Sequence, residues 1–232
     1  MLQGFDLNRF VIQIATLLFA VTIHEVAHGW VACRLGDPTA KRAGRLTLNP
    51  IKHLDPMGSI LLPLMLSLMK SPFIFGYAKP VPVNFHNLHN HRRDTILVAS
   101  AGVTANLVCA GLCGMTSQLL LALRFLWVHP LLAGIVSDFY LILGYSVFIN
   151  AILAVFNLIP IPPLDGSHVL SMLLPPQHAR RLAQIERFGM LILVFLLFTG
   201  VINSILWFFV NPLLRAFLGN EGLLVFFKYL MQ

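Results

Sequence analysis

The chain has 232 residues, of which 57% are hydrophobic and only 11% are charged, and its net charge is +7. Soluble domains carry roughly 25% charged residues, so this composition excludes an ordinary soluble protein and indicates a helical membrane protein. The positive charge does not indicate a nucleic-acid partner, because no cluster of lysine and arginine is interleaved with aromatic residues; basic loops on the cytoplasmic side of a membrane explain it better. The three cysteines, without a C-x-x-C motif, exclude a disulfide framework and a cysteine-based metal site.

The first apolar run covers about residues 8–35 and predicts a membrane span. After a polar loop, the run 57–69 contains Pro63 and is only about 20 Å long at 1.5 Å per residue. Because a hydrocarbon core is about 30 Å thick, this run predicts a re-entrant or partial span. Residues 77–90, which include prolines, predict an extended segment.

Two further apolar runs, 95–126 and 131–159, predict the third and fourth elements within the membrane. Residues 175–188 predict a short, basic amphipathic helix, and residues 189–210 predict a fifth span. Residues 213–230 are apolar but interrupted by charges and glycines, and form either a last span or an interfacial segment. The expected fold class is therefore an all-α integral membrane protein with five or six transmembrane helices and a re-entrant or extended segment between the first and third apolar runs.

The basic residues predict the orientation of the chain. Twelve of the 16 lie in three segments, 34–52, 70–93 and 180–187. If residues 57–69 enter and leave the membrane on the same face, all three segments lie on one face, which the positive-inside rule makes cytoplasmic. We therefore expect a multi-pass protein of the cell membrane whose N-terminus lies outside and whose first span ends at the cytoplasmic face.

Near the end of that first span stands His24-Glu25-Val26-Ala27-His28, the H-E-x-x-H pattern of helical zinc sites. Two histidines four residues apart project about 40° from each other on a helix, so both imidazoles can reach one metal ion. Glu25 stands beside them and can take a proton from an attacking water. A chance match is the alternative, but a charged glutamate at membrane depth is costly without a function.

A third ligand must come from elsewhere, because catalytic zinc usually takes three protein ligands and leaves one position for water. Asp165 is one of few acidic residues in apolar surroundings, and it follows the proline-rich turn 160–163 that ends the fourth span. A helix-capping role for Asp165, and ligation by His168 in its place, are the alternatives. The histidines of the polar loops, among them His86, His89 and His91, are expected to be solvated, and a weak second metal site formed by these three is the alternative.

These residues make the chain resemble the site-2 protease family of intramembrane zinc metalloproteases, peptidase family M50, in its compact branch without a PDZ domain. Besides H-E-x-x-H, the resemblance rests on Asn157-Leu158-Ile159-Pro160-Ile161-Pro162-Pro163-Leu164-Asp165-Gly166, with weaker matches at 48–50, 53–58 and 78–84. It implies one Zn²⁺ per chain on His24, His28 and Asp165, with Glu25 as general base. It also implies hydrolysis of peptide bonds within or next to transmembrane segments, in regulated intramembrane proteolysis or in the clearance of membrane-anchored remnants.

Two asparagines are candidate catalytic residues. The oxyanion of the tetrahedral intermediate needs a hydrogen-bond donor, and the side chain of Asn157 or of Asn106 could supply it. Asn157 could instead bond backbone groups freed by the prolines, and Asn106 with Gly102 could serve helix packing. The family often has proline where Val103 stands, so the match around Asn106 is imperfect. The extended residues 77–84 could receive an unwound substrate as an added strand.

The whole chain, residues 1–232, is expected to form one integral peptidase domain, with a metal-site core at about 8–174 and C-terminal apolar segments at about 189–230. The expected partners are transmembrane protein substrates and the lipid bilayer, and the sequence leaves the oligomeric state open. The alternative function is a metal-binding membrane transporter or channel, because histidine and aspartate within a membrane also mark ion paths. Transporters usually contain internal repeats, and this sequence shows none.

Overall fold

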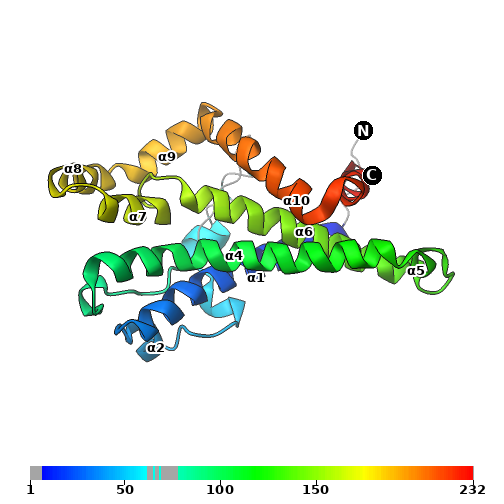
Figure 1. The fold of residues 1–232 in the computed structure, drawn as a ribbon, viewed down its shortest axis with the longest axis horizontal. Coiled ribbons are helices and arrows are strands. Elements are labelled where there is room, and N and C mark those ends of the chain that lie inside the picture. Colours follow the sequence, from blue (N-terminus) through cyan, green and yellow to red (C-terminus); the bar gives the residue numbers. More distant parts are fainter. Residues whose placement is uncertain (1–6, 62–64, 66–67, 69–77, 232) are drawn as a thin grey trace.

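The computed structural model describes residues 7–61, 65, 68 and 78–231, and all regular structure in this part of the chain is helical (Figure 1). Four helices are long: α1 (Leu7–Arg34), α4 (His91–Ala122), α6 (Ala133–Leu158) and α10 (Val201–Met231). The shorter ones are α2 (Thr39–Arg42), η1 (Pro50–His53), η2 (Pro56–Leu61), η3 (Phe85–Asn87), α5 (Arg124–Val128), α7 (Asp165–Leu173), α8 (Pro176–Glu186) and α9 (Gly189–Phe198). The predicted all-α class is confirmed.

Each long helix contains an apolar stretch that is long enough to cross a membrane, namely Phe10–Arg34, His91–Ala122, Ala133–Leu158 and Val201–Tyr229. The first, third and fourth apolar runs of the sequence correspond to α1, α4 and α6. The predicted amphipathic basic helix is α8. The multi-pass integral character of the chain is therefore confirmed.

The fifth predicted span, residues 189–210, is divided in the structure. Gly200 adopts a φ of 75°, a left-handed conformation that glycine accepts at little steric cost, and it separates α9 from α10. The ten residues of α9 extend only about 15 Å, too short to cross the membrane alone. Residues 213–230 belong to α10, which bends at Gly219. The described residues thus hold four helices of spanning length, against an expectation of five or six.

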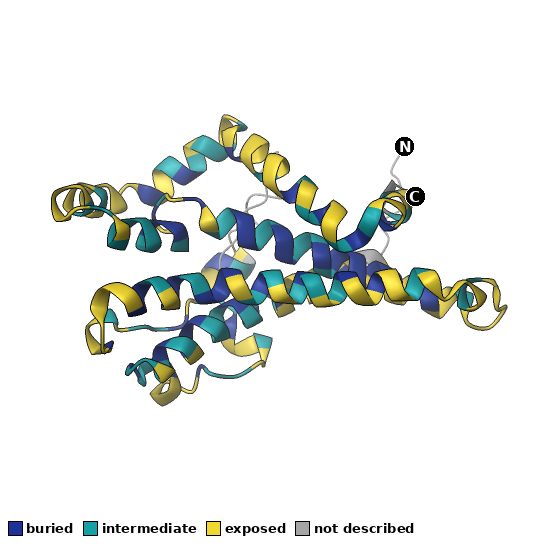
Figure 2. Cartoon of the chain, in the orientation of Figure 1, coloured by how far each residue is buried: buried dark blue, intermediate teal, exposed yellow. Residues whose placement is uncertain are grey.

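Helix α6 is the central helix of the bundle. It packs against α1, α4 and α10, and 56% of its apolar stretch is buried, compared with 22–33% for the other three (Figure 2). Small residues let the helices approach closely, since Ala20 of α1, Ala110 of α4 and Ala151 and Ala154 of α6 are fully buried. Side chains from three helices can therefore meet inside the bundle.

The outward faces of the helices are apolar. Leu112, Met115 and Leu119 of α4 are 60–70% exposed, and Phe195 of α9 and Phe208 of α10 are similarly open. A contiguous apolar surface of this kind is rare on a soluble monomer. It suits the acyl chains of a bilayer.

Two residues of the connection between α1 and α4, His53 and Lys79, are hydrogen-bonded to each other. The backbone N–H of Lys79 donates to the carbonyl of His53, with N and O 2.9 Å apart. In the predicted partial span 57–69, residues 57–61 lie in η2. Residues 62–64, 66, 67 and 69–77 lie outside the described part of the chain. This bond places His53 and Lys79 side by side, and a re-entrant path of the residues between them stays a prediction.

Candidate metal centre and active site

The two histidines of the H-E-x-x-H motif lie on the inner face of α1. Their relative exposures are 6% for His24 and 8% for His28, and their ring centroids are 4.6 Å apart. The spacing of four residues places both on one side of the helix, and α4 covers that side. Their Nε2 atoms are 3.0 Å apart and point to the same spot.

The other ring nitrogens are each held by an acceptor from α4. Nδ1 of His24 lies 2.6 Å from Oδ1 of Asn106, and Nδ1 of His28 lies 2.7 Å from the carbonyl oxygen of Val98. An oxygen that only accepts requires the proton on Nδ1. Both Nε2 atoms are therefore left with lone pairs, the form in which imidazole binds a metal.

Asp165 places a third potential metal-ligating atom beside the two Nε2 atoms. The turn after α6, which contains a cis peptide bond between Pro162 and Pro163, ends with Asp165 as the first residue of α7. Its Oδ2 lies 3.0 Å from Nε2 of His24 and 3.2 Å from Nε2 of His28. The predicted meeting of Asp165 with the two histidines, across about 140 residues of chain, is found in the structure.

The chemistry of these three atoms fits a zinc ion. Oδ2 of Asp165 is a buried oxygen with no hydrogen-bond donor among the described residues. Three lone pairs that face one another in a buried site repel unless a cation lies among them. Separations of 3.0–3.2 Å are close to the roughly 3.3 Å between ligands of tetrahedral zinc with bonds of about 2.0–2.1 Å, and two imidazoles with one carboxylate are a common zinc ligand set.

Gly102 of α4 lies directly against the two imidazoles. A methyl group on Gly102 would lie 2.5 Å from Nε2 of His28 and 2.6 Å from Cε1 of His24. The sequence predicted a helix-packing role for Gly102. In the structure, the space where a side chain would lie is filled by the imidazole rings of His24 and His28. Only glycine lets α4 approach α1 closely enough for Asn106 and Val98 to reach the histidines.

The carboxylate of Glu25 is bound by an extended segment, residues 78–84. The backbone N–H of Val81 donates to Oε2 of Glu25, with N and O 2.7 Å apart. The Val81 side chain is buried and packs over Gly29, one turn further along α1. Of the predicted extended residues 77–90, residues 78–84 have no regular secondary structure and Asn84 is extended, whereas residues 85–87 form η3 and depart from the prediction. The bond from Val81 holds the candidate base beside the two histidines.

Two anchors fix this extended segment. Arg45 donates through Nη2 to the carbonyl of Lys79 at 2.7 Å. Asp37 is fully buried and accepts bonds from the backbone N–H of Asn84 at 2.7 Å, from Nδ2 of Asn87 at 2.8 Å, and from the backbone N–H and hydroxyl of Thr39. Burial of Asp37 opposes its ionisation, but these donors outweigh it and hold the pKa of the carboxyl below its ordinary value.

The other candidate residues lie as follows. Both N–H groups of the Asn106 amide are engaged, by the Ala20 carbonyl at 3.3 Å and by Oδ1 of Asn150 at 2.7 Å. Asn157 donates to the carbonyl of Leu153 within α6.

The His168 ring packs on Phe85, with centroids 5.5 Å apart. In the described part of the chain, the trio of His24, His28 and Asp165 is the one cluster of metal-ligating side chains, so the loop histidines are not assembled into a second.

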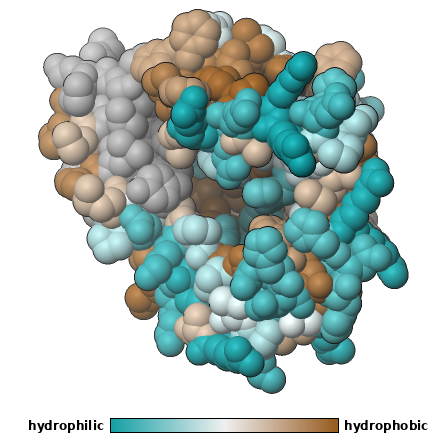
Figure 3. Space-filling view, turned by 90° about the vertical axis from the view of Figure 1, so that its left-hand side faces the viewer, coloured by the Kyte–Doolittle hydropathy of each residue, from teal (hydrophilic) through white to brown (hydrophobic). Residues whose placement is uncertain are grey.

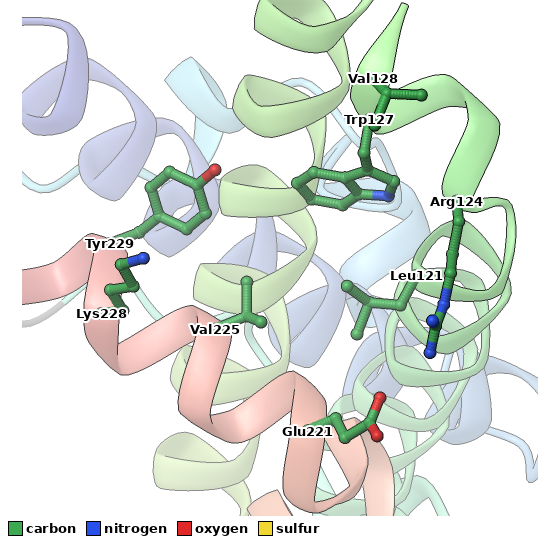
Figure 4. A pocket seen from close by; sticks show the side chains of 8 residues that line it. All are labelled: Leu121, Arg124, Trp127, Val128, Glu221, Val225, Lys228 and Tyr229. Carbon is green, nitrogen blue, oxygen red and sulfur yellow. The ribbon is translucent and has the colours of Figure 1, made fainter.

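A cavity of about 500 Å³ lies at the other end of the bundle (Figure 4). Its wall is formed by Leu121, Arg124, Trp127, Val128, Glu221, Val225, Lys228 and Tyr229. Along α4, Leu121 is 19 residues from Gly102, or about 28 Å. The cavity is therefore remote from the histidines.

Sequence reasoning missed three contacts at the centre. The Val98 carbonyl and the Val81 N–H are backbone groups, so the residue types at these positions do not predict their contacts. Asn150 lies in a run of apolar residues in the middle of α6, and its polarity at that depth was the one available signal.

The sequence matches one protein family and several curated relatives. The model of the family described as "Peptidase family M50" matches residues 12–200. YwhC of Bacillus subtilis (strain 168) is 36% identical over 219 residues, which cover 94% of this chain and 92% of YwhC. Rip2 of Mycolicibacterium smegmatis is 34% identical over 200 residues, 86% of this chain and 71% of Rip2, and Rip2 of Mycobacterium tuberculosis (strain H37Rv) is 33% identical over 203 residues, with the same coverage.

The names of these relatives designate them provisionally as zinc metalloproteases. No solved structure matches the chain. Nothing in the comparisons supports the alternative of a metal transporter or channel. The chain therefore belongs to peptidase family M50 and is an intramembrane zinc metalloprotease that acts on membrane proteins within the lipid bilayer.

Proposed function

We propose that His24, His28 and Asp165 hold one zinc ion per chain and that Glu25 is the general base for peptide hydrolysis. The observation that supports this proposal best is the convergence of two Nε2 lone pairs and a buried, otherwise unpaired carboxylate oxygen within 3.2 Å of one another. When bound there, zinc supplies a Lewis acid that polarises the scissile carbonyl and makes water a stronger acid.

The remaining steps belong to residues of the chain. Glu25 follows His24 directly and lies on the same turn of α1. Its carboxylate can therefore take a proton from the attacking water and return it to the leaving amine. The Val81 N–H holds one carboxylate oxygen at 2.7 Å and leaves the other for this transfer. With the proton on Nδ1, each imidazole would offer the lone pair of its Nε2 atom to the metal.

For the oxyanion donor, we favour Asn157 over Asn106. The amide of Asn106 already directs its N–H groups to Ala20 and Asn150. Asn157 stands at the end of α6, eight residues before Asp165, and commits one N–H to its own helix. An Asn157→Ala enzyme should lose most of its kcat with little change in zinc affinity.

The extended residues 78–84 suit the binding of an unwound substrate. A transmembrane helix hides its peptide bonds in its own hydrogen bonds, so it must open before hydrolysis. The segment runs past Glu25 and is anchored by Arg45 and Asp37, which makes it a fixed edge against which a substrate strand can lie.

We further propose that the site opens to the cytoplasmic side of the cell membrane and that the whole chain acts as one peptidase domain. Viewed from the end that carries α7 and α8, the molecule is hollowed, with an apolar floor ringed by hydrophilic side chains (Figure 3). Exposed arginines stand at this end, Arg92 and Arg93 at the start of α4 and Arg180 and Arg181 on α8. The positive-inside rule favours the cytoplasm for such a face.

The decisive experiment is the Glu25→Gln exchange. The variant should bind one zinc per chain, as measured by elemental analysis of the purified protein, while cleavage of a membrane-protein substrate falls by at least about 100-fold, a typical loss for a general base. His24→Ala should lose both zinc and cleavage. Retention of full cleavage by Glu25→Gln would refute the assignment of the base.

A further inference from the structure

A chain of buried amides extends from His24 into the centre of the bundle. Asn106 of α4 is fully buried and Asn150 of α6 is 3% exposed. Oδ1 of Asn106 lies 2.6 Å from Nδ1 of His24, its Nδ2 lies 2.7 Å from Oδ1 of Asn150, and Nδ2 of Asn150 lies 2.8 Å from the Ser146 carbonyl. Three helices thus contribute to one line of hydrogen bonds.

Two backbone carbonyls fix the direction of this line. Nδ2 of Asn106 also lies 3.3 Å from the Ala20 carbonyl, and Nδ2 of Asn150 faces the Ser146 carbonyl. Carbonyl oxygens accept only, so neither amide can rotate its oxygen into those positions without placing two oxygens together. The amide oxygen of Asn150 is therefore directed to Asn106, and that of Asn106 to His24.

The consequence is a fixed tautomer at His24. An acceptor oxygen at Nδ1 holds the ring proton there and directs the Nε2 lone pair toward His28 and Asp165. His28 gets the same assistance from the Val98 carbonyl, which no side-chain replacement removes. Because water does not reach the buried amides, nothing else can take their place.

We propose that Asn106 and Asn150 are positioning residues for the zinc site: Asn106 fixes the tautomer and ring orientation of His24, and Asn150 fixes Asn106. This inference rests on the proposed zinc ligation by His24. Outer partners of metal-bound histidines typically contribute 10- to 100-fold in metal affinity. The proposal adds a residue of α6 that contacts neither metal nor substrate.

The test is the zinc dissociation constant of the full chain in detergent, measured by competition with a chelator. Asn106→Leu should weaken zinc binding by about 10- to 100-fold and shift the visible absorption spectrum of the cobalt-substituted protein. Ser117→Ala is the matched control. Ser117 is a fully buried polar residue of the same helix and donates to Gly114, away from the site.

A double-mutant cycle tests Asn150. Asn150→Leu should cause a smaller loss of zinc affinity than Asn106→Leu, and the loss should vanish in the Asn106→Leu background, because Asn150 acts through Asn106. Equal losses in both backgrounds would overturn its role. If Asn106→Leu does not fold, Asn106→Ala removes the same acceptor with less bulk.

The two levels of the proposal fail in different ways. If His24→Ala binds zinc as the wild type does, the zinc site itself is wrong. If His24→Ala loses zinc but Asn106→Leu matches Ser117→Ala in zinc affinity and cobalt spectrum, only the role of the two asparagines is refuted.

Discussion

Replacement of Gly102 by alanine tests the packing on which the site depends. The added methyl group would lie 2.5 Å from Nε2 of His28 and 2.7 Å from Nδ1 of His24, whereas ordinary contacts of a Cβ begin at 3.4 Å. Both rings would have to move, by roughly 0.8–0.9 Å, or α4 would have to withdraw. Zinc–nitrogen bonds of about 2.0–2.1 Å tolerate shifts of only about 0.2 Å.

Neither ring can move without loss. Each is held at Nδ1, by Asn106 or by Val98, so a displaced ring leaves a buried polar group unpaired. Overpacking of a tight core typically costs about 1–3 kcal/mol. We expect that cost to appear in the metal-bound form, as a zinc dissociation constant that is roughly 5- to 150-fold larger.

Gly111→Ala is the matched control, because it is the same exchange on the same helix. A methyl group there would meet Cε1 of Phe217 at 3.7 Å, an ordinary contact. Alanine is the better helix former by about 1 kcal/mol, so this variant should unfold at a slightly higher temperature and bind zinc normally. Chelator competition on both purified variants decides the matter, and zinc affinities that agree within a factor of two would refute the packing argument.

The remaining predictions concern the extended segment and its anchors. Val81→Pro removes the N–H that holds Glu25 and should lower kcat by about tenfold at unchanged zinc content, whereas Val81→Ala, which keeps the N–H, should lower it less; equal activities of the two would exclude the backbone contact as a determinant. Asp37→Asn should destabilise the fold by about 2 kcal/mol at pH 7, seen as a lower thermal unfolding midpoint in detergent, because a buried charged acceptor is lost. The pKa of Asp37 is lowered in the folded state, so its contribution is complete above the ordinary value of 3.8 and disappears as the pH falls through the lower folded value. The wild type should therefore lose stability below about pH 4 more steeply than Asp37→Asn, and parallel pH profiles would contradict this assignment. Phe226→Ala should weaken the attachment of the end of α10, since its ring is fully buried against Gly144 of α6, and we expect a loss of about 3 kcal/mol in unfolding experiments.

Much of the fold could be predicted because the hydropathy of the sequence is sufficient to identify membrane helices. The bounds of α1 and α6 agree with the apolar runs to within about two residues. The division at Gly200 escaped prediction, because the residues on both sides are apolar and one glycine does not show from sequence whether it will adopt a positive φ.

The candidate site was predictable to a different degree. The spacing of His24 and His28 is a local property of one helix, and the proline-rich turn marked Asp165 as the partner. The contacts of Val81, Val98 and Asn150 depend on how helices distant in sequence approach one another, and no local pattern carries that information. The roles of Asn106 and Asn157 likewise stay predictions.

The distance along the chain between the three proposed ligands has a consequence for biosynthesis. A nascent polypeptide that has been inserted only as far as α4 carries both imidazoles but lacks the carboxylate at position 165. If Asp165 is the third ligand, hydrolysis cannot begin before α7 has been translated, so the enzyme stays inactive toward other membrane proteins until α1, α4 and α6, three of its four described helices of spanning length, have been made.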